Sequence, residues 1–177
     1  MRRALRIALA LTVSACGPSG SPDAVPEPDP AAGSPPVATA PASAASAVEP
    51  YVNARFGFAV DVPAAFGAQP APQNADGRTF RSPDGAASLV VFGYQDAVGA
   101  GLEGLAERVR EDLDSLAYSA RPPGGIVASG PAGEDVVYAR ALYRDGVGVL
   151  ARLRYPATRP EGGAWAEALD ASLRWTE

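Results

Sequence analysis

The sequence has no histidine and no lysine, and it has one cysteine and one methionine among 177 residues. Nucleophilic sites that use histidine as a base, Schiff-base chemistry on lysine, and zinc sites made of histidine and cysteine therefore lack their essential side chains. Sites that use carboxylate pairs, tyrosine or arginine clamps, and sites that bind a cation through oxygen, remain possible for this sequence. We therefore expect a protein that is not an enzyme and that holds no cofactor or metal.

The single cysteine, Cys16, cannot form a disulfide within the chain, and it directly follows a segment typical of an export signal. That segment begins with three arginines, continues with a short apolar run over 7–13 and ends with two small residues. The run is shorter than the ~20 apolar residues that span a bilayer. The segment therefore predicts export rather than a permanent transmembrane helix.

Val13-Ser14-Ala15-Cys16 resembles the lipobox of bacterial lipoproteins. In that family the signal is cut before the cysteine, and the cysteine is acylated on its sulfur and usually on its new amino group. Two or three acyl chains anchor a protein stably to a membrane. The resemblance implies a signal peptide at 1–15, lipidation of Cys16, and a location in the cell envelope facing the periplasm or the exterior. Gly17 favours the outer membrane where two membranes exist. The alternative is an ordinary signal peptide that is cut after Ala15.

Residues 17–50 consist mainly of proline, alanine, serine and acidic residues, and nine of the 18 prolines lie there. Such a segment cannot bury enough apolar surface to offset its conformational entropy. We expect lipidated Cys16 and the rest of 16–50 to form a disordered tether. Removal of the leader takes three of 15 arginines and lowers the net charge from −5 to −8, which argues against a nucleic-acid partner.

All phenylalanine, tyrosine and tryptophan residues lie in 51–177, which is long enough for one folded domain. Alternating apolar residues predict the first strand, which Pro63 ends, and a loop follows over 64–77. The turn Ser82-Pro83-Asp84-Gly85 predicts a hairpin. The predicted strands are 55–62, 78–82, 87–95, 126–129, 134–144 and 147–155.

Asp145-Gly146 is the strongest hairpin signal in the chain. A two-residue turn there pairs 144 with 147, 142 with 149 and 140 with 151. One face of this hairpin then carries Tyr138 and Arg140 among apolar residues. The opposite face carries Tyr143, Arg152 and Arg154.

Two helices are expected in the domain. Leucines and a valine at helical spacing predict the first over 102–116. Thr158-Arg159-Pro160-Glu161 has the form of a capping box, and it precedes a final helix that carries Trp165, Leu169 and Leu173.

The order of these segments resembles the PsbP-like fold. The resemblance rests on "NARFGFAVDVP", the hairpins "FRSPDGAASLVV" and "YRDGVGVLARLRYP", the helix between them and the final helix that ends in "SLR". It implies an α+β domain with a central antiparallel sheet of about six strands flanked by two main helices. It also implies a non-catalytic module that assists assembly of a larger complex or binds a partner.

Function is then expected to depend on a binding surface for an envelope protein or a small ligand. Its candidate residues are Tyr138, Arg140, Tyr143, Arg152 and Arg154, together with the loop 64–77, because arginine beside tyrosine is common at interfaces. In the alternative, Arg140 pairs with an acid of the chain, and Arg152 and Arg154 face water.

Two other functions stay open. One is a structural spacer lipoprotein without a specific ligand. The other is a carboxylate-dependent wall-glycan hydrolase, which needs two acids facing one cleft. The adjacent pairs Glu111/Asp112 and Glu134/Asp135 do not suggest one, because neighbouring side chains point apart.

Overall fold

The structure, a computed structural model, describes residues 48–177. The predicted signal peptide, Cys16 and nearly all of the predicted tether lie outside the described residues. In chain order the elements are β1 (Val48–Asn53), β2 (Phe58–Pro63), β3 (Gly67–Ala68), β4 (Gly77–Arg81), β5 (Ser88–Gln95), α1 (Gly101–Arg108), β6 (Tyr118–Ala120), β7 (Gly125–Ala132), β8 (Asp135–Arg144), β9 (Val147–Pro156), α2 (Gly162–Ser172) and β10 (Arg174–Trp175).

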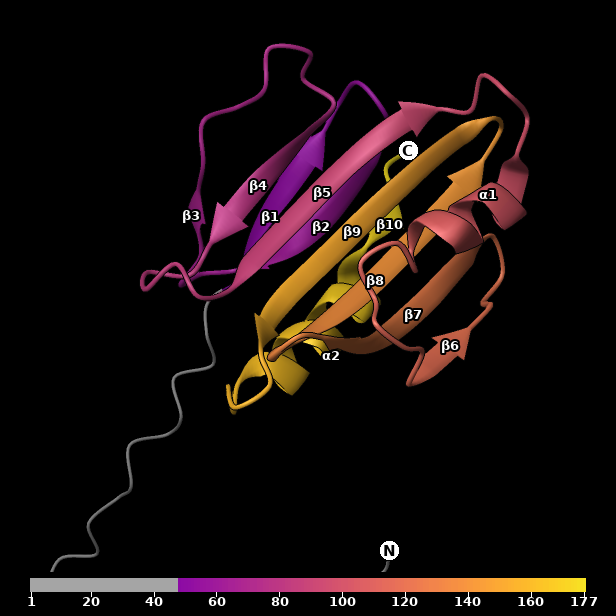
Figure 1. Cartoon of the computed structure of the whole chain (residues 1–177). Helices are drawn as coiled ribbons and strands as arrows, with labels where there is room; N and C mark the ends of the chain where they lie inside the picture. Colours follow the sequence, from indigo (N-terminus) through magenta and orange to yellow (C-terminus); the bar gives the residue numbers. More distant parts are fainter. Residues whose placement is uncertain (1–47) are drawn as a thin grey trace, which may run out of the picture. The chain divides into compact units, whose positions relative to one another are not determined.

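These strands form two antiparallel sheets (Figure 1). The large sheet has seven strands in the order β3-β4-β5-β9-β8-β7-β6, and the small sheet has the order β1-β2-β10. The predicted α+β class with a central antiparallel sheet and two helices is confirmed. The small sheet was not expected, because β10 has only two residues and β1 begins at Val48, inside the predicted tether.

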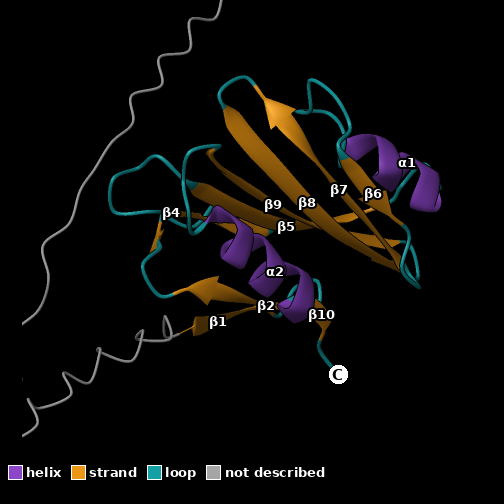
Figure 2. Cartoon of the chain, turned by 90° about the horizontal axis from the view of Figure 1, so that it is seen from below, coloured by secondary structure: helices purple, strands orange, loops and turns teal. Residues whose placement is uncertain are grey.

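The large sheet separates two apolar cores, one on each face (Figure 2). On one face lie the small sheet and α2, which packs against β2, β8 and β9. Phe58, Leu89 and Leu153 are almost completely buried in this core. On the other face α1 packs against β7 and β8 and buries Leu105 and Val109. Burial of each such side chain contributes roughly 1.5–3 kcal/mol.

The β8–β9 hairpin has the predicted register. Arg144 pairs with Val147, Leu142 with Val149, and Arg140 with Ala151. Both turn residues, Asp145 and Gly146, have positive φ angles of 51° and 78°. A two-residue turn of this kind matches the twist of the flanking strands and fixes their pairing.

The β4–β5 hairpin is also confirmed, and its turn is held by one carboxylate. Asp84 accepts hydrogen bonds from the Ser82 hydroxyl and from the backbone N–H of Ala86, at 2.5 and 3.1 Å. These bonds, with a further one from Arg159, hold the pKa of Asp84 well below its usual range. Gly85 closes the turn with a φ of 70°.

The first helix is shorter than its periodicity predicts. Apolar spacing predicted a helix through Leu116, but α1 ends at Arg108. The backbone N–H of Asp114 donates to the carbonyl of Pro131, and the Asp114 carboxylate accepts from the backbone N–H of Gly133. These bonds hold the segment after α1 against the end of β7. A continuation of the helix would not reach this position.

The start of the last helix also differs from the prediction. The predicted capping box at 158–161 is wrong, because α2 begins at Gly162 and has no side-chain cap. Arg159 instead pairs with Asp84 and lies over the ring of Trp165. Neither helix in residues 48–177 is long and apolar enough to cross a membrane.

The predicted first strand over 55–62 is interrupted at its beginning. Residues 54–57 form a tight turn between β1 and β2, in which Gly57 has a φ of 65° and donates its N–H to the carbonyl of Asn53. Phe56 is buried beside this turn. The turn brings β1 alongside β2 as the outer strand of the small sheet.

Candidate functional site

The five residues predicted to form a binding surface lie on opposite faces of the large sheet. Tyr138 and Arg140 point toward the α2 side, as the alternation of β8 requires. Tyr143, Arg152 and Arg154 belong to the α1 side, where the first of them packs beside the second core. The structure therefore does not bring the five together.

On the α2 side, Arg140 and Tyr138 share one partner. The Nε of Arg140 lies 3.1 Å from a carboxylate oxygen of Asp170 in α2, and the Arg140 side chain is only 11% exposed. Burial, together with the nearby Asp170 carboxylate, raises the pKa of the Tyr138 hydroxyl. Arg140 and Asp170 line a depression of about 370 Å³ beside β6. The structure thus agrees with the alternative in which Arg140 pairs with an acid of the chain.

On the α1 side the predicted residues are engaged within the chain. Arg154 lies 2.6 Å from the Asp135 carboxylate, and Arg152 pairs with Asp112 just beyond α1. The hydroxyl of Tyr143 donates a 2.8 Å hydrogen bond to Asp96. The same carboxylate accepts the backbone N–H groups of Ala100 and Gly101 at the start of α1. These contacts join the helix and the loops at its ends to the sheet.

Stability should fall at alkaline pH. Burial raises the pKa of Tyr94, Tyr138 and Tyr155, and the hydrogen bond to Asp96 raises that of Tyr143. The unfolded chain loses these protons near pH 10, before the folded chain does, so the free energy of unfolding declines as pH rises above about 10. With no histidine or lysine, it should stay nearly constant from about pH 6 to 9. Urea unfolding across this range tests both parts.

Tyr138→Phe is the matched variant for this prediction. It removes the titrating hydroxyl and keeps the ring, so the alkaline loss of stability should become smaller. A variant with the same alkaline slope as the wild type would contradict the assignment.

The structure reveals a different arginine that sequence analysis missed. Arg78 lies on β4, where it pairs with Val91 and shares a face with the buried Phe80. Its side chain is half-buried, and its Nε is out of contact with water and has no hydrogen-bond partner. Within residues 50–177, whose side chains the structure describes, no carboxylate pairs with it.

Three depressions of the surface meet at Arg78, with volumes of about 350, 260 and 160 Å³. The first lies over β4 and β5 beside the segment that connects β3 to β4, and the second lies between the end of β1 and that segment. The third lies among β1, the end of β2, β3 and β4. We call this region the Arg78 cleft. Its lining includes Tyr51, Asn53, Arg55, Asp76, Arg78 and Phe80.

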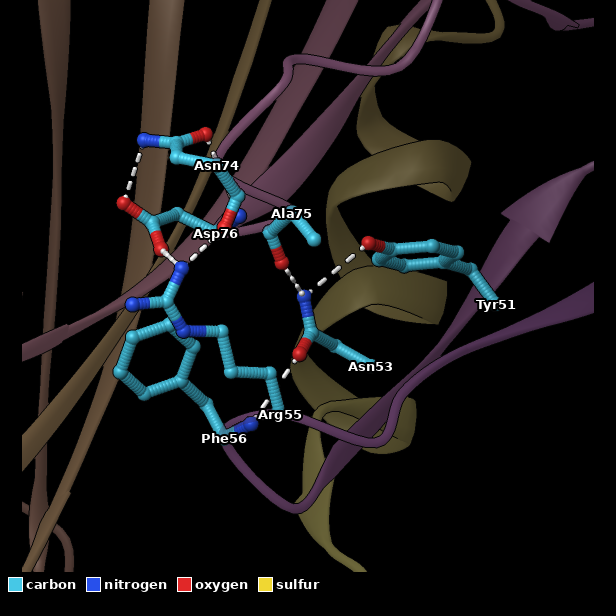
Figure 3. Close-up of polar contacts among 7 residues, drawn as sticks. All are labelled: Tyr51, Asn53, Arg55, Phe56, Asn74, Ala75 and Asp76. Atoms are coloured by element: carbon cyan, nitrogen blue, oxygen red, sulfur yellow. Dashed lines mark hydrogen bonds and ion pairs between the residues drawn. The ribbon is translucent and has the colours of Figure 1, made fainter.

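Asn53 holds the wall of the Arg78 cleft in place (Figure 3). This side chain is 5% exposed, and its amide donates to the carbonyl of Ala75 at 3.1 Å and to the hydroxyl of Tyr51 at 3.2 Å. Its oxygen accepts the backbone N–H of Phe56 at 3.1 Å. Ala75 has a φ of 52°, which costs free energy for a residue with a side chain. The wall is therefore fixed by specific contacts.

A second contact joins the same wall to the β1–β2 turn. The guanidinium of Arg55 lies 2.6 Å from the Asp76 carboxylate, and Asn74 donates to the other carboxylate oxygen at 2.6 Å (Figure 3). Asp76 is thus already engaged by partners of the chain. Arg55 and Arg78 both line the depression of about 260 Å³, whose lining includes no carboxylate.

The loop 64–77 was part of the predicted surface, and its second half forms the wall of the Arg78 cleft. One signal could have found Arg78 as well. Alternation along 78–82 places Arg78 on the same face as Phe80. This predicts a charged side chain among apolar ones, which is the pattern that identified Arg140. The sequence did not predict that β1 lies beside the Arg78 cleft, because β1 lies partly in the predicted tether.

Each of the four depressions has at most one carboxylate in its lining, Asp76 or Asp170, whereas glycoside hydrolysis needs two. In residues 48–177 no cluster of three metal-ligating side chains is found.

No protein-family model matches the chain, and comparison with curated proteins finds no match. Solved structures do match. Mog1p, a Ran-binding protein of Saccharomyces cerevisiae, has a TM-score of 0.54 at 8% identity, over 75% of this chain and 97% of Mog1p. Cyanobacterial PsbP (CyanoP) of Synechocystis has a TM-score of 0.51 at 12% identity, over 80% and 99%.

The domain has a PsbP-like and Mog1-like fold. This confirms the fold that the sequence resemblance implied. A protein of Bacteroides thetaiotaomicron also matches, with a TM-score of 0.51 at 10% identity over 72% of this chain. The chain spans about half of that protein, 48% of its length. Identities this low show a common fold and nothing about what each protein binds.

Proposed function

We propose that this protein is a lipid-anchored protein of the cell envelope whose domain binds a partner protein or a small ligand in the Arg78 cleft, without catalysing a reaction. The observation that carries the proposal is the meeting of three depressions at one half-buried arginine without a partner in residues 50–177. Arg140, Arg152 and Arg154, the arginines that the sequence predicted for the binding surface, are already paired with aspartates.

The fixed wall of the Arg78 cleft supports a binding site rather than a loop that contacts only water. Hydrogen bonds from Asn53 and the ion pair of Arg55 with Asp76 fix the wall before any ligand arrives. A preformed site loses less conformational entropy on binding. Mog1p, which is by its description a Ran-binding protein, indicates that the fold is compatible with a protein partner.

The proposal is tested by photo-crosslinking in intact envelopes. A photoreactive amino acid replaces Val52, which lines the Arg78 cleft and is 57% exposed. The matched control replaces Val98, which is 88% exposed and lies on the loop before α1. Amine-directed reagents are unsuitable because the chain has no lysine.

We expect a crosslinked protein or small molecule from position 52 that is absent from position 98. Mass spectrometry of the adduct distinguishes a protein from a small ligand. Equal products at both positions, or none at position 52 with good yield of the protein, would overturn the proposal and favour a spacer.

A further inference from the structure

We infer that Arg78 is an anion-binding residue and that the ligand of the Arg78 cleft presents a carboxylate or phosphate group to it, next to an apolar part. This inference rests on the proposed function, because it names the chemistry of the same cleft. Four observations support it, and they concern partners, burial, local charge and the apolar lining.

The first observation is the distribution of partners among the twelve arginines of residues 48–177. Seven form ion pairs with a carboxylate, two others lie over aromatic rings, and Arg110 donates to a carbonyl. Arg78 and Arg81 are left, and Arg81 is exposed to water. Within the described residues, Arg78 alone is thus half-buried without any of these partners.

The second observation concerns the cost of that arrangement. A guanidinium stays charged in proteins and carries five N–H donors in a rigid fork. The Arg78 Nε is removed from water and donates to nothing in the structure. A buried donor without an acceptor is unfavourable, so a ligand oxygen would remove this cost once the Arg78 side chain turns its Nε toward it. Two oxygens of a carboxylate or phosphate match the fork.

The third observation is the local charge. The depression at the end of β1 is lined by Arg55 and Arg78, and its lining includes no carboxylate. Asp76 lines the neighbouring depression together with Arg78, but its carboxylate is bound by Arg55 and Asn74. One aspartate beside two arginines leaves a net positive site on a protein whose net charge is −5.

The fourth observation is the composition of the smallest depression, of about 160 Å³. Among the lining residues that the structure describes, Arg78 is the one with a charge, and the others are apolar or aromatic and include Val62, Phe66 and Phe80. Tyr51 and Phe80 form its aromatic edge, with ring centroids 5.5 Å apart. An anion at Arg78 can therefore place an attached apolar group in this depression.

The test is NMR of the purified full-length protein in detergent, observing the arginine Nε–H signals. Arg78→Gln removes one signal and thereby assigns it. Three probes are added in turn: inorganic phosphate, phenylacetate, and phenylacetamide as the neutral counterpart of phenylacetate. Arg81→Gln is the matched control, since it removes the other arginine without a partner from the same strand.

We expect a saturable shift of the Arg78 signal with phenylacetate, with phosphate or with both, and the responding probe identifies which anion is preferred. Arg81→Gln should bind as the wild type does. Arg78→Gln should bind at least about tenfold more weakly, as loss of a charge-assisted hydrogen bond predicts. Arg78→Met, which keeps the stem of the side chain, replaces Arg78→Gln should that variant fail to fold.

No shift of the Arg78 signal with either anion would overturn the inference, and so would equal binding by Arg78→Gln. Phenylacetamide that shifts cleft signals as strongly as phenylacetate would also overturn it, while leaving the Arg78 cleft as a binding site. Crosslinking at position 52 is measured separately from the NMR titration. Failure of the proposed function would remove the crosslink, whereas failure of this inference alone would leave the crosslink and change only the response to the anions.

Discussion

Replacement of Gly77 by alanine should destabilise the domain by about 3 kcal/mol or more, a large effect for a single methyl group. Gly77 is the first residue of β4 and is buried at the base of the Arg78 cleft. A Cβ atom built there would lie 2.0 Å from the backbone oxygen of Val91 and 2.6 Å from the Cα of Phe92.

The reason for this magnitude is that the obstacle is backbone. A flexible side chain could move aside, but Val91 and Phe92 belong to β5, in the middle of the paired strands of the large sheet. Relief of the overlap requires β4 to move away from β5, which weakens the pairing that positions Arg78. Urea unfolding measures the loss, and binding to the cleft should weaken with it.

Gly163→Ala is the matched control. Gly163 lies in the first turn of α2, is exposed, and has no atom within 4 Å of its built Cβ. Alanine there should raise stability by roughly 0.5–1 kcal/mol, because glycine is unfavourable in a helix. Equal losses at both positions would show that the close approach at Gly77 is not the cause.

Replacement of Cys16 by serine should move the protein from the membrane fraction to the soluble fraction almost completely. The lipobox resemblance implies acyl chains on this residue, and each buried methylene of a chain contributes ~0.8 kcal/mol to membrane binding. Fractionation of envelopes, followed by intact-protein mass spectrometry, measures both location and lipid.

Ser19→Ala is the control for this prediction, because it changes a small residue just outside the lipobox. That variant should stay in the membrane fraction and keep the added mass of the lipid. The alternative of an ordinary signal peptide predicts a soluble wild-type protein that starts with an unmodified Cys16. A wild type of that kind, or a Cys16→Ser variant that stays bound to membranes, would reject lipid anchoring at this residue.

Local sequence determined the hairpins of the large sheet. Asp145 and Gly146 accept positive φ angles, so the turn has two residues and the register of β8 with β9 follows from it. Alternation along these strands also placed Tyr138 and Arg140 on one face and Tyr143 on the other. The same reasoning predicted the β4–β5 hairpin, since Ser82, Asp84 and Gly85 satisfy their own turn.

Contacts between distant segments decided the features that the sequence did not predict. The first helix ends at Arg108 because Asp114 is bound to the end of β7, although the apolar spacing continues. The capping box did not form, since α2 begins at Gly162 with Glu161 at its N-cap position, and Arg159 pairs with Asp84, far away in the chain. Periodicity describes only one segment, whereas these contacts depend on the packing of two.

The sequence by itself therefore determined the α+β class, the strand faces, the hairpin register and the chemistries that lack their side chains. Only the tertiary structure decided which arginines have partners. Arg140, Arg152 and Arg154 pair with aspartates from other segments, whereas Arg78 has no such partner among the side chains of residues 50–177. Ion pairing depends on distances of a few ångströms between segments far apart in the chain, and a linear pattern does not contain those distances.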